Sequence, residues 1–218
     1  MQFDLTRRLA AEALGTLFLV MAVVGSGIMA QKLTGGNEAL ALLCNTIATG
    51  AVLFVIITIF VSVSGAHFNP AVSLVMWVRG ALSRGDMLAY IVVQVVGGCL
   101  GAIAAHLMFD LDPVQFSQTA RNGIGQWVGE LIATILGCMR FKMAAIAPAV
   151  GLYITAAYWF TSSTSFANPA VTIARAFSDT FSGIAPHDVP AFLVAEIAGA
   201  LAAAAILGWL FRPENAVK

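Results

Sequence analysis

The tripeptide Asn-Pro-Ala occurs twice in the sequence, once from Asn69 and once from Asn168. Asparagine is a strong helix N-cap, proline is favoured at the first helical position and alanine is the best helix former, so each copy predicts a helix start. A helix start brings roughly +0.5 of an elementary charge, and an asparagine amide can donate N–H to a solute while its oxygen caps the helix. This chemistry repels cations and accepts neutral molecules that carry hydroxyl groups.

Both predicted helices are short. We expect them over 70–79 and 169–178, roughly 15 Å each at about 1.5 Å per residue, or half of a hydrocarbon core about 30 Å thick. If they enter from opposite faces, they meet at the centre of the bilayer, where small Ala71 and Ala170 let them approach closely. Irregular backbone at that depth is tolerated where it is buried in protein or lines a cavity. The serine-, glycine- and threonine-containing stretches before each asparagine therefore predict a polar path lined by carbonyl groups.

The composition identifies lipid as the solvent. Of 218 residues, 60% are hydrophobic and 10% are charged, whereas soluble chains carry roughly 25% charged residues. At about 20 apolar residues per helical pass, this length allows six or seven passes in one channel domain, residues 1–218. The predicted fold is an all-α membrane protein with six transmembrane helices and two re-entrant half-helices. The spans are expected over Leu9–Ala30, Ala39–Val63, Met87–Phe109, Ile124–Met139, Met143–Phe160 and Pro190–Phe211.

The cations of the chain orient these spans, because positively charged loops stay in the cytoplasm. Most lysines and arginines fall on the side of the two termini, which we therefore place in the cytoplasm. Arg7 and Arg8 before an apolar run are also compatible with a cleaved signal peptide. We favour a first span that stays in place, because it is long enough to cross and its Glu12 recurs in the second half. The cytoplasmic set is Arg7, Arg8, Arg79, Arg84, Arg140, Lys142, Arg212 and Lys218, and the opposite set is Lys32, Arg121 and Arg175.

The chain repeats itself with inverted topology. The segment Glu12–Thr16 is echoed by Glu130–Thr134, and Gln94–Gly97 is echoed by Glu196–Gly199. Each half holds three spans and one Asn-Pro-Ala, and three is odd, so the second copy starts on the opposite side of the membrane. Inverted repeats in a membrane protein indicate a pathway at their shared midplane. The two halves are residues 1–110 and 121–218.

The rest of the composition narrows the function classes. The formal net charge is zero, with 11 basic and 11 acidic residues, so the chain has no basic surface for nucleic acid and we expect no such partner. Cys44, Cys99 and Cys138 lie in apolar stretches without CxxC or Cys/His spacing; we interpret them as inert and expect no metal or cofactor. We also expect no thiol on the predicted path. No cluster of His, Asp or Glu lies near either half-helix, which argues against an intramembrane enzyme.

The two Asn-Pro-Ala motifs, a preceding Ser-Gly-x-x-x-Asn-Pro-Ala-Val run, six spans and a glutamate in the first span of each half closely resemble the aquaporin and aquaglyceroporin family over nearly the whole chain. The resemblance implies a homotetramer of independently conducting subunits, with Asn69 and Asn168 at the middle of each pore. It also implies that Glu12 and Glu130 accept backbone N–H groups from the re-entrant loops. A proton relay is the competing interpretation of the glutamates, but no chain of ionisable residues joins them.

The sequence departs from the family pattern at the outer constriction. The family usually has an arginine directly after the second Asn-Pro-Ala, and this chain has Val171. By the family's spacing, the other constriction residues would be Thr49, Ala156 and Ser165. All four side chains are small, so we expect a wide, uncharged selectivity filter that admits neutral molecules larger than water.

Two residues beside the motifs have more than one possible role. Arg175 lies one helical turn beyond Val171 and either restores positive charge to the pore vestibule or pairs on the surface with Asp179, four residues further on. We favour the surface pair, because such pairs are common and weak. His67, two residues before Asn69, is expected in the cytoplasmic vestibule, where it either lines the pore or acts as a pH gate; we favour a lining role.

Together these features predict a passive channel for glycerol, arsenous acid and water in a bacterial inner membrane. The run from Ser165 to Asp179 resembles a bacterial aquaglyceroporin branch associated with arsenic resistance, which makes arsenite the preferred solute. Two alternatives stay open. A strict water channel would treat Val171 as a neutral change. A secondary transporter would also show inverted repeats and broken helices, although it would normally place an ionisable coupling group at its central site.

Overall fold

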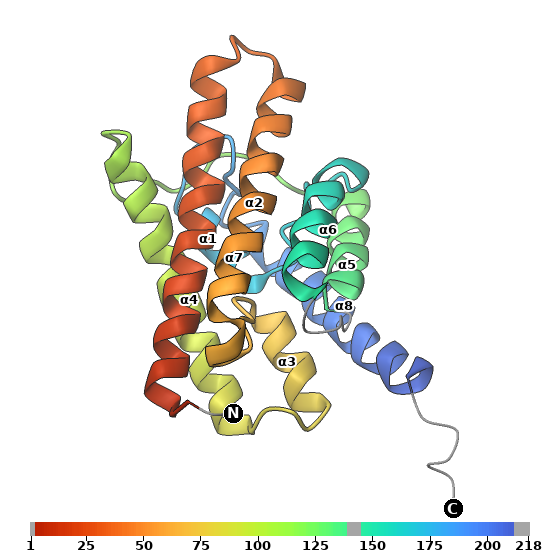
Figure 1. Cartoon of the computed structure of the whole chain (residues 1–218). Coiled ribbons are helices and arrows are strands. Elements are labelled where there is room, and N and C mark those ends of the chain that lie inside the picture. The colour runs from red at the N-terminus through yellow and green to blue at the C-terminus, as the bar shows by residue number, and fades with distance from the viewer. Residues whose placement is uncertain (1–2, 139–144, 212–218) are drawn as a thin grey trace, which may run out of the picture.

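The computed structural model describes residues 3–138 and 145–211, which form eight helices and no strand. Four of the helices, of 22 to 29 residues, are long and apolar enough to cross a membrane, and two shorter apolar helices accompany them. The prediction of an all-helical membrane fold is therefore confirmed. The helices are α1 (Leu5–Leu33), α2 (Glu38–Ser64), α3 (Pro70–Val78), α4 (Arg84–Met108), α5 (Ile124–Gly137), α6 (Ile146–Phe160), α7 (Pro169–Arg175) and α8 (Val189–Leu210) (Figure 1).

Several helix boundaries follow from local capping. The side chains of Asp4, Asn37 and Ser83 accept hydrogen bonds from backbone N–H groups in the first turns of α1, α2 and α4, which satisfies donors that a helix start otherwise leaves unpaired. Gly65 ends α2 in the left-handed conformation with φ of 91°, as expected for a glycine cap. The expected fourth and fifth spans end and begin at Met139 and Met143, which lie outside the described residues.

Small residues bring the long helices together. A Cβ atom on Gly97 of α4 would collide with the carbonyl of Ala13 in α1, and one on Gly101 would collide with that of Leu17. In the second half, a Cβ on Gly199 of α8 would lie 2.6 Å from the carbonyl of Leu131 in α5. The α1–α4 and α5–α8 pairs are thus equivalent close packings, as the repeated sequence predicts.

The two half-helices run toward opposite ends of α4. The chain that leaves α3 enters the start of α4 at Arg84. Beyond α7, in contrast, Ser178 bonds His106 in the last turn of α4 with 2.9 Å between Oγ and Nε2. Figure 1 shows α3 in the lower part of the bundle, near the start of α1, and α7 near its middle.

Both half-helices are shorter than expected. Instead of 70–79 and 169–178, α3 has nine residues and α7 has seven, so α7 rises only about 10 Å. The expected end at Ser178 is wrong because side chains bind the following loop: Arg175 Nε donates to the carbonyl of Ser182, and Ser178 bonds His106. Such side-chain bonds compete with continuation of a helix.

Candidate functional site

A cavity of about 740 Å³ occupies the centre of the bundle and is lined by both loops that precede the half-helices. Helix α2 contributes every fourth residue, Thr49, Leu53, Ile57 and Val61, and α6 contributes Ile146, Val150, Ile154 and Tyr158 with the same spacing. Since residues four apart share a helix face, each helix presents one stripe to the cavity. The lining extends from Arg79 and Phe211 at one end to Arg175 at the other.

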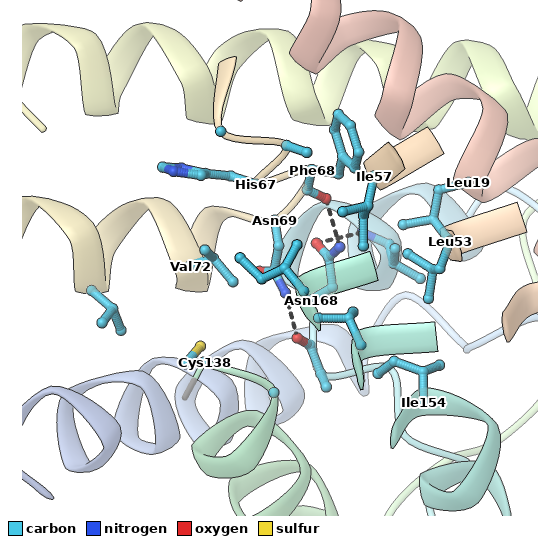
Figure 2. A pocket seen from close by; sticks show the side chains of 18 of the residues that line it. Leu19, Leu53, Ile57, His67, Phe68, Asn69, Val72, Cys138, Ile154 and Asn168 are labelled. Carbon is cyan, nitrogen blue, oxygen red and sulfur yellow. Dashed lines mark hydrogen bonds between the residues drawn. The ribbon is translucent and has the colours of Figure 1, made fainter. Parts of the chain in front are cut away.

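Asn69 and Asn168 both line this cavity and cap their own half-helices. Asn69 Oδ1 accepts the N–H of Ala71 at 2.8 Å, and Asn168 Oδ1 accepts that of Ala170 at 3.0 Å. Their amide nitrogens cross between the halves: Asn69 Nδ2 donates to the carbonyl of Ala167 at 2.7 Å, and Asn168 Nδ2 donates to that of Phe68 at 2.8 Å (Figure 2). Each amide has a second N–H, and both asparagines line the cavity.

The two loops share one unusual backbone conformation. In each loop φ is positive at the third residue and at the first residue before the asparagine. The values are 51° at Ala66 and 49° at Phe68 in the first loop, and 48° at Ser165 and 47° at Ala167 in the second. Such values are uncommon for residues other than glycine and persist only where the surroundings hold them. The loops are therefore held by the rest of the bundle.

Buried glutamates supply much of that hold. Glu12 of α1 accepts the backbone N–H groups of His67 at 2.9 Å and Phe68 at 2.7 Å. Glu130 of α5 accepts those of Phe166 at 2.9 Å and Ala167 at 2.6 Å. Both carboxylates are completely buried, and each binds the two residues directly before an asparagine. The structure thus places Glu12 and Glu130 against equivalent parts of the two loops.

Two further residues, Gln94 and Glu196, support the loops and half-helices, and the sequence pattern did not predict this role. Gln94 Nε2 of α4 donates to Glu12 at 2.8 Å and to Ser73 Oγ at 3.1 Å. Glu196 of α8 accepts the N–H of Asn168 at 3.0 Å and the hydroxyl of Thr172 at 2.6 Å. The sequence pairs Gln94 with Glu196 only as members of the repeat. Their signal was a polar side chain in the middle of an apolar span, where such groups need partners.

Three of the four expected filter residues, Thr49, Ser165 and Val171, are buried and line the cavity. The expectation for Ala156 is wrong, because this residue is exposed and lies off the cavity lining. Tyr158 lines the cavity in its place, with its hydroxyl 3.4 Å from Thr49 Oγ1. At about 100° per residue, position 156 faces away from the stripe that carries 154 and 158. This end of the cavity therefore includes an aromatic ring and is not built from small side chains alone.

Arg175 is buried and lines the cavity, with 1% of its surface exposed. Its guanidinium carbon lies 3.4 Å from the centre of the Phe166 ring. Asp179, the expected partner, instead accepts the backbone N–H of Gln118 at 2.8 Å. The preferred interpretation of Arg175 as a surface arginine paired with Asp179 is therefore wrong, because the cation–π contact and the loop carbonyl of Ser182 hold the side chain inside.

His67 and Cys138 also line the cavity (Figure 2). His67 is half-buried, and its Nδ1 lies 3.0 Å from Ser73 Oγ. Cys138 follows the end of α5 and is 8% exposed. The expectation that no thiol lines the path is thus corrected: the apolar stretch that contains Cys138 borders the cavity. Within residues 3–138 and 145–211, His, Cys, Asp and Glu form no group that would hold a metal ion.

Comparison with known proteins agrees with this geometry. The profile of the family described as "Major intrinsic protein" matches residues 1–139 and 128–218. The chain is 57% identical to "Aquaglyceroporin AqpS" of Rhizobium meliloti (strain 1021) over 222 aligned residues, which cover 99% of this chain and 95% of the relative. It is 33% identical over 124 residues to "Aquaporin Z" of Photorhabdus laumondii, with 55% of this chain and 52% of that relative covered.

A solved structure shows the same fold. The X-ray structure of the aquaglyceroporin from Plasmodium falciparum superimposes with a TM-score of 0.72 at 20% identity, covering 95% of this chain and 97% of the other. The family profile spans both halves of the chain, and the relative of Rhizobium meliloti matches nearly all of it. Crossed asparagines at a central cavity, buried carboxylates behind the loops and these similarities lead to one conclusion: the chain belongs to the major intrinsic protein family.

Proposed function

We propose that the protein is a passive channel through which small neutral solutes pass beside Asn69 and Asn168. The observation that carries this proposal is the pair of crossed amide–carbonyl hydrogen bonds at the centre of the cavity. They leave each asparagine one N–H for a solute oxygen, and they bring two helix N-termini together, whose partial positive charges oppose cations. No enzymatic step is needed for this activity.

Glycerol, arsenous acid and water are the proposed solutes. Val171, Thr49 and Ser165 leave room at the cavity end where relatives usually have an arginine, and the Tyr158 hydroxyl adds a polar group there. Pore width and lining groups decide which neutral molecules pass. The relative that is 57% identical is named an aquaglyceroporin, which supports a channel for polyols. The resemblance of the run from Ser165 to Asp179 to an arsenic-resistance branch supports arsenous acid.

The proposed architecture is six spans and two half-helices per subunit, a homotetramer in which each subunit forms its own channel, and both termini in the cytoplasm of a bacterial cell. The inverted arrangement of α3 and α7 at opposite ends of α4 supports the repeat of residues 1–110 and 121–218. The charge count supports the orientation. Of its cytoplasmic cations, Arg140, Lys142, Arg212 and Lys218 lie outside the described residues.

Stopped-flow light scattering on proteoliposomes tests the proposal. With glycerol as the osmolyte, vesicles that contain the protein should shrink and then re-swell, and arsenous acid should enter at a rate that rises linearly with its gradient. Empty vesicles are the control. Shrinkage without re-swelling would identify a strict water channel. Saturation of the flux, or dependence on a proton or sodium gradient, would identify a secondary transporter.

A further inference from the structure

The cavity end beyond Asn168 carries a charged group that the Asn-Pro-Ala motif does not provide. Val171 and Arg175 are four residues apart in α7, share one face and both line the cavity. Arg175 comes seven residues after Asn168, which is about 10 Å along the helix. The positive charge of this chain is therefore displaced by one turn from Val171, where relatives usually have an arginine.

The guanidinium of Arg175 is held in a fixed position. Its Nε donates to the carbonyl of Ser182, and its central carbon lies over the ring of Phe166, 3.4 Å from the ring centre. The ring is fixed in turn, because Phe192 packs against it edge-to-face at 5.2 Å and the backbone N–H of Phe166 is bound by Glu130. A guanidinium that is positioned in advance loses little conformational freedom when it binds a solute.

Two polar atoms at this end have no protein partner among the described residues. Arg175 Nη1 and Ser165 Oγ are both buried without a hydrogen bond, and both residues line the cavity. Ser165 directly precedes the ring that Arg175 covers, so the two groups belong to one region of the cavity wall. Because leaving buried polar atoms unpaired is costly, they mark a place where oxygen atoms of water or solute bind.

The charge of Arg175 is also not neutralised at close range. In the part of the chain that the structure describes, none of the ion pairs within 4.0 Å involves this guanidinium. The buried carboxylates of this half are engaged elsewhere: Glu130 binds loop N–H groups, and Glu196 binds the N–H of Asn168 and the hydroxyl of Thr172. Arg121, whose guanidinium carbon lies 5.0 Å from the same Phe166 ring, lies off the cavity lining and donates to loop carbonyls.

We propose that Arg175 and Ser165 form the selectivity site of the channel, in which Arg175 Nη1 donates to one hydroxyl of a neutral polyhydroxy solute, Ser165 Oγ bonds another, and the positive charge excludes cations. This inference rests on the proposed function. A hydroxyl both donates and accepts, so solutes with two or more hydroxyl groups fit both atoms. A unit charge about 6 Å from a passing cation disfavours that cation roughly 100-fold at an effective dielectric constant of about 20.

Replacing Arg175 by glutamine tests the site in proteoliposomes. The readouts are sodium leak, followed with a potential-sensitive dye, and water and glycerol flux by stopped flow. We expect sodium leak to rise at least about tenfold, while water flux stays within about threefold of the wild-type rate. Arg121→Gln is the matched control, because its guanidinium donates to the carbonyls of Gly183, Ser163 and Phe181 and the residue lies off the lining of this cavity. Its sodium leak should equal the wild-type value.

A charge swap tests the same site by rescue. In the double variant V171R/R175Q the arginine returns to the position directly after Asn-Pro-Ala. Sodium leak should fall back to the wild-type level, and glycerol flux should drop at least about tenfold because the new side chain fills the space beside Val171. If R175Q does not fold, R175M replaces it, since methionine fills a similar volume and is the residue that α3 carries at the equivalent position, Met76.

The outcomes separate the two proposals. If wild-type protein passes neither water nor glycerol, the channel proposal fails and this inference fails with it. If wild-type protein passes glycerol but the variants without Arg175 leak no more sodium than wild type, the channel stands and the selectivity role of Arg175 is overturned. Leak in R121Q equal to that in R175Q would also overturn it, because a general loosening of the loops would then explain both.

Discussion

The two re-entrant segments share their backbone and differ in the side chains that face the cavity. Both have positive φ at the same two positions before asparagine, both give two N–H groups to a buried glutamate, and each asparagine binds the other loop. Two residues before asparagine, however, one has His67 and the other Phe166. One turn beyond the valine, α3 has Met76 and α7 has Arg175.

The residues that the two halves share hold the backbone of both re-entrant loops, and we expect the residues that differ between the halves to decide which solutes pass. The repeated parts place two helix starts at the centre of the bundle. The unrepeated parts put an apolar methionine, Met76, at the position of α3 that matches the buried, fixed Arg175 of α7. Discrimination between solutes is therefore expected on the α7 side, and variants at matched positions of the two halves test that statement.

The largest effect is expected from the two buried glutamates that hold the re-entrant loops. Glu12→Ala and Glu130→Ala should each leave two buried loop N–H groups unpaired, at about 1–3 kcal/mol per group, which is a large part of the stability of a typical domain. Folded yield and melting temperature in detergent measure this loss. Glu38→Ala, at an exposed glutamate in the first turn of α2, should cost less than about 1 kcal/mol. If one of the two buried glutamates were dispensable, the loops would not be equivalent.

The next largest effect is expected at Val171 in the second half of the chain and not at the matched Val72 in the first. Val171→Arg places a second guanidinium one turn from Arg175, so glycerol and arsenous acid flux should fall at least about tenfold while water flux stays within about threefold. Stopped-flow measurements on the same vesicles provide both rates. Val72→Arg, at the matched position of α3, is the comparison. Equal loss of glycerol flux in both variants would contradict selectivity on the α7 side, and unchanged flux in V171R would place Val171 away from the narrowest point.

A smaller effect is expected at Tyr158, which lines the cavity where the family's spacing predicted Ala156. Tyr158→Phe removes a hydrogen-bonding group from the cavity wall beside Thr49, and the ratio of glycerol to water flux should fall about two- to tenfold, the equivalent of one hydrogen bond. Ala156→Val changes a residue that lies off the cavity, so the same ratio should not move. An altered ratio in A156V with none in Y158F would restore the spacing-based assignment.

The sequence predicts features with local causes and misses those with distant ones. The starts of α3 and α7 follow from three adjacent residues, and the structure has both at the expected prolines. The end of α7 depends on His106, 72 residues away from Ser178, and no local pattern reports it. The same holds for Tyr158, because the face that α6 turns to the cavity is decided by its packing against α2.

For Arg175, the sequence predicts the face of the helix but not the partner of the side chain. Its spacing from Val171 correctly places both residues on one face, but spacing cannot say whether Asp179 or Phe166 binds the guanidinium. The choice is made by the loop that carries Ser182, which the chain reaches only after α7 ends. Cys138 is similar: its apolar surroundings are visible in the sequence, whereas its position beside the cavity follows from how the end of α5 packs.

The smallest effect is expected where the two halves carry different polar residues at equivalent positions, Gln94 in α4 and Glu196 in α8. The variant Glu196→Gln gives the second half the residue of the first. A glutamine oxygen can still accept from Asn168 N–H and the Thr172 hydroxyl, so stability should change by less than about 1 kcal/mol and glycerol flux should stay within about twofold. Melting temperature and stopped flow measure both. A large loss would mean that the second half needs a carboxylate where the first does not.

The flux predictions above all depend on solutes passing beside the two crossed asparagines. A density map of the protein in lipid nanodiscs with glycerol, at a resolution that shows ordered water, would show the path itself. We expect a continuous file of water or glycerol density through the cavity, within hydrogen-bonding distance of Asn69 Nδ2 and Asn168 Nδ2. Side chains packed against both amides, with the density running elsewhere or ending before them, would contradict it.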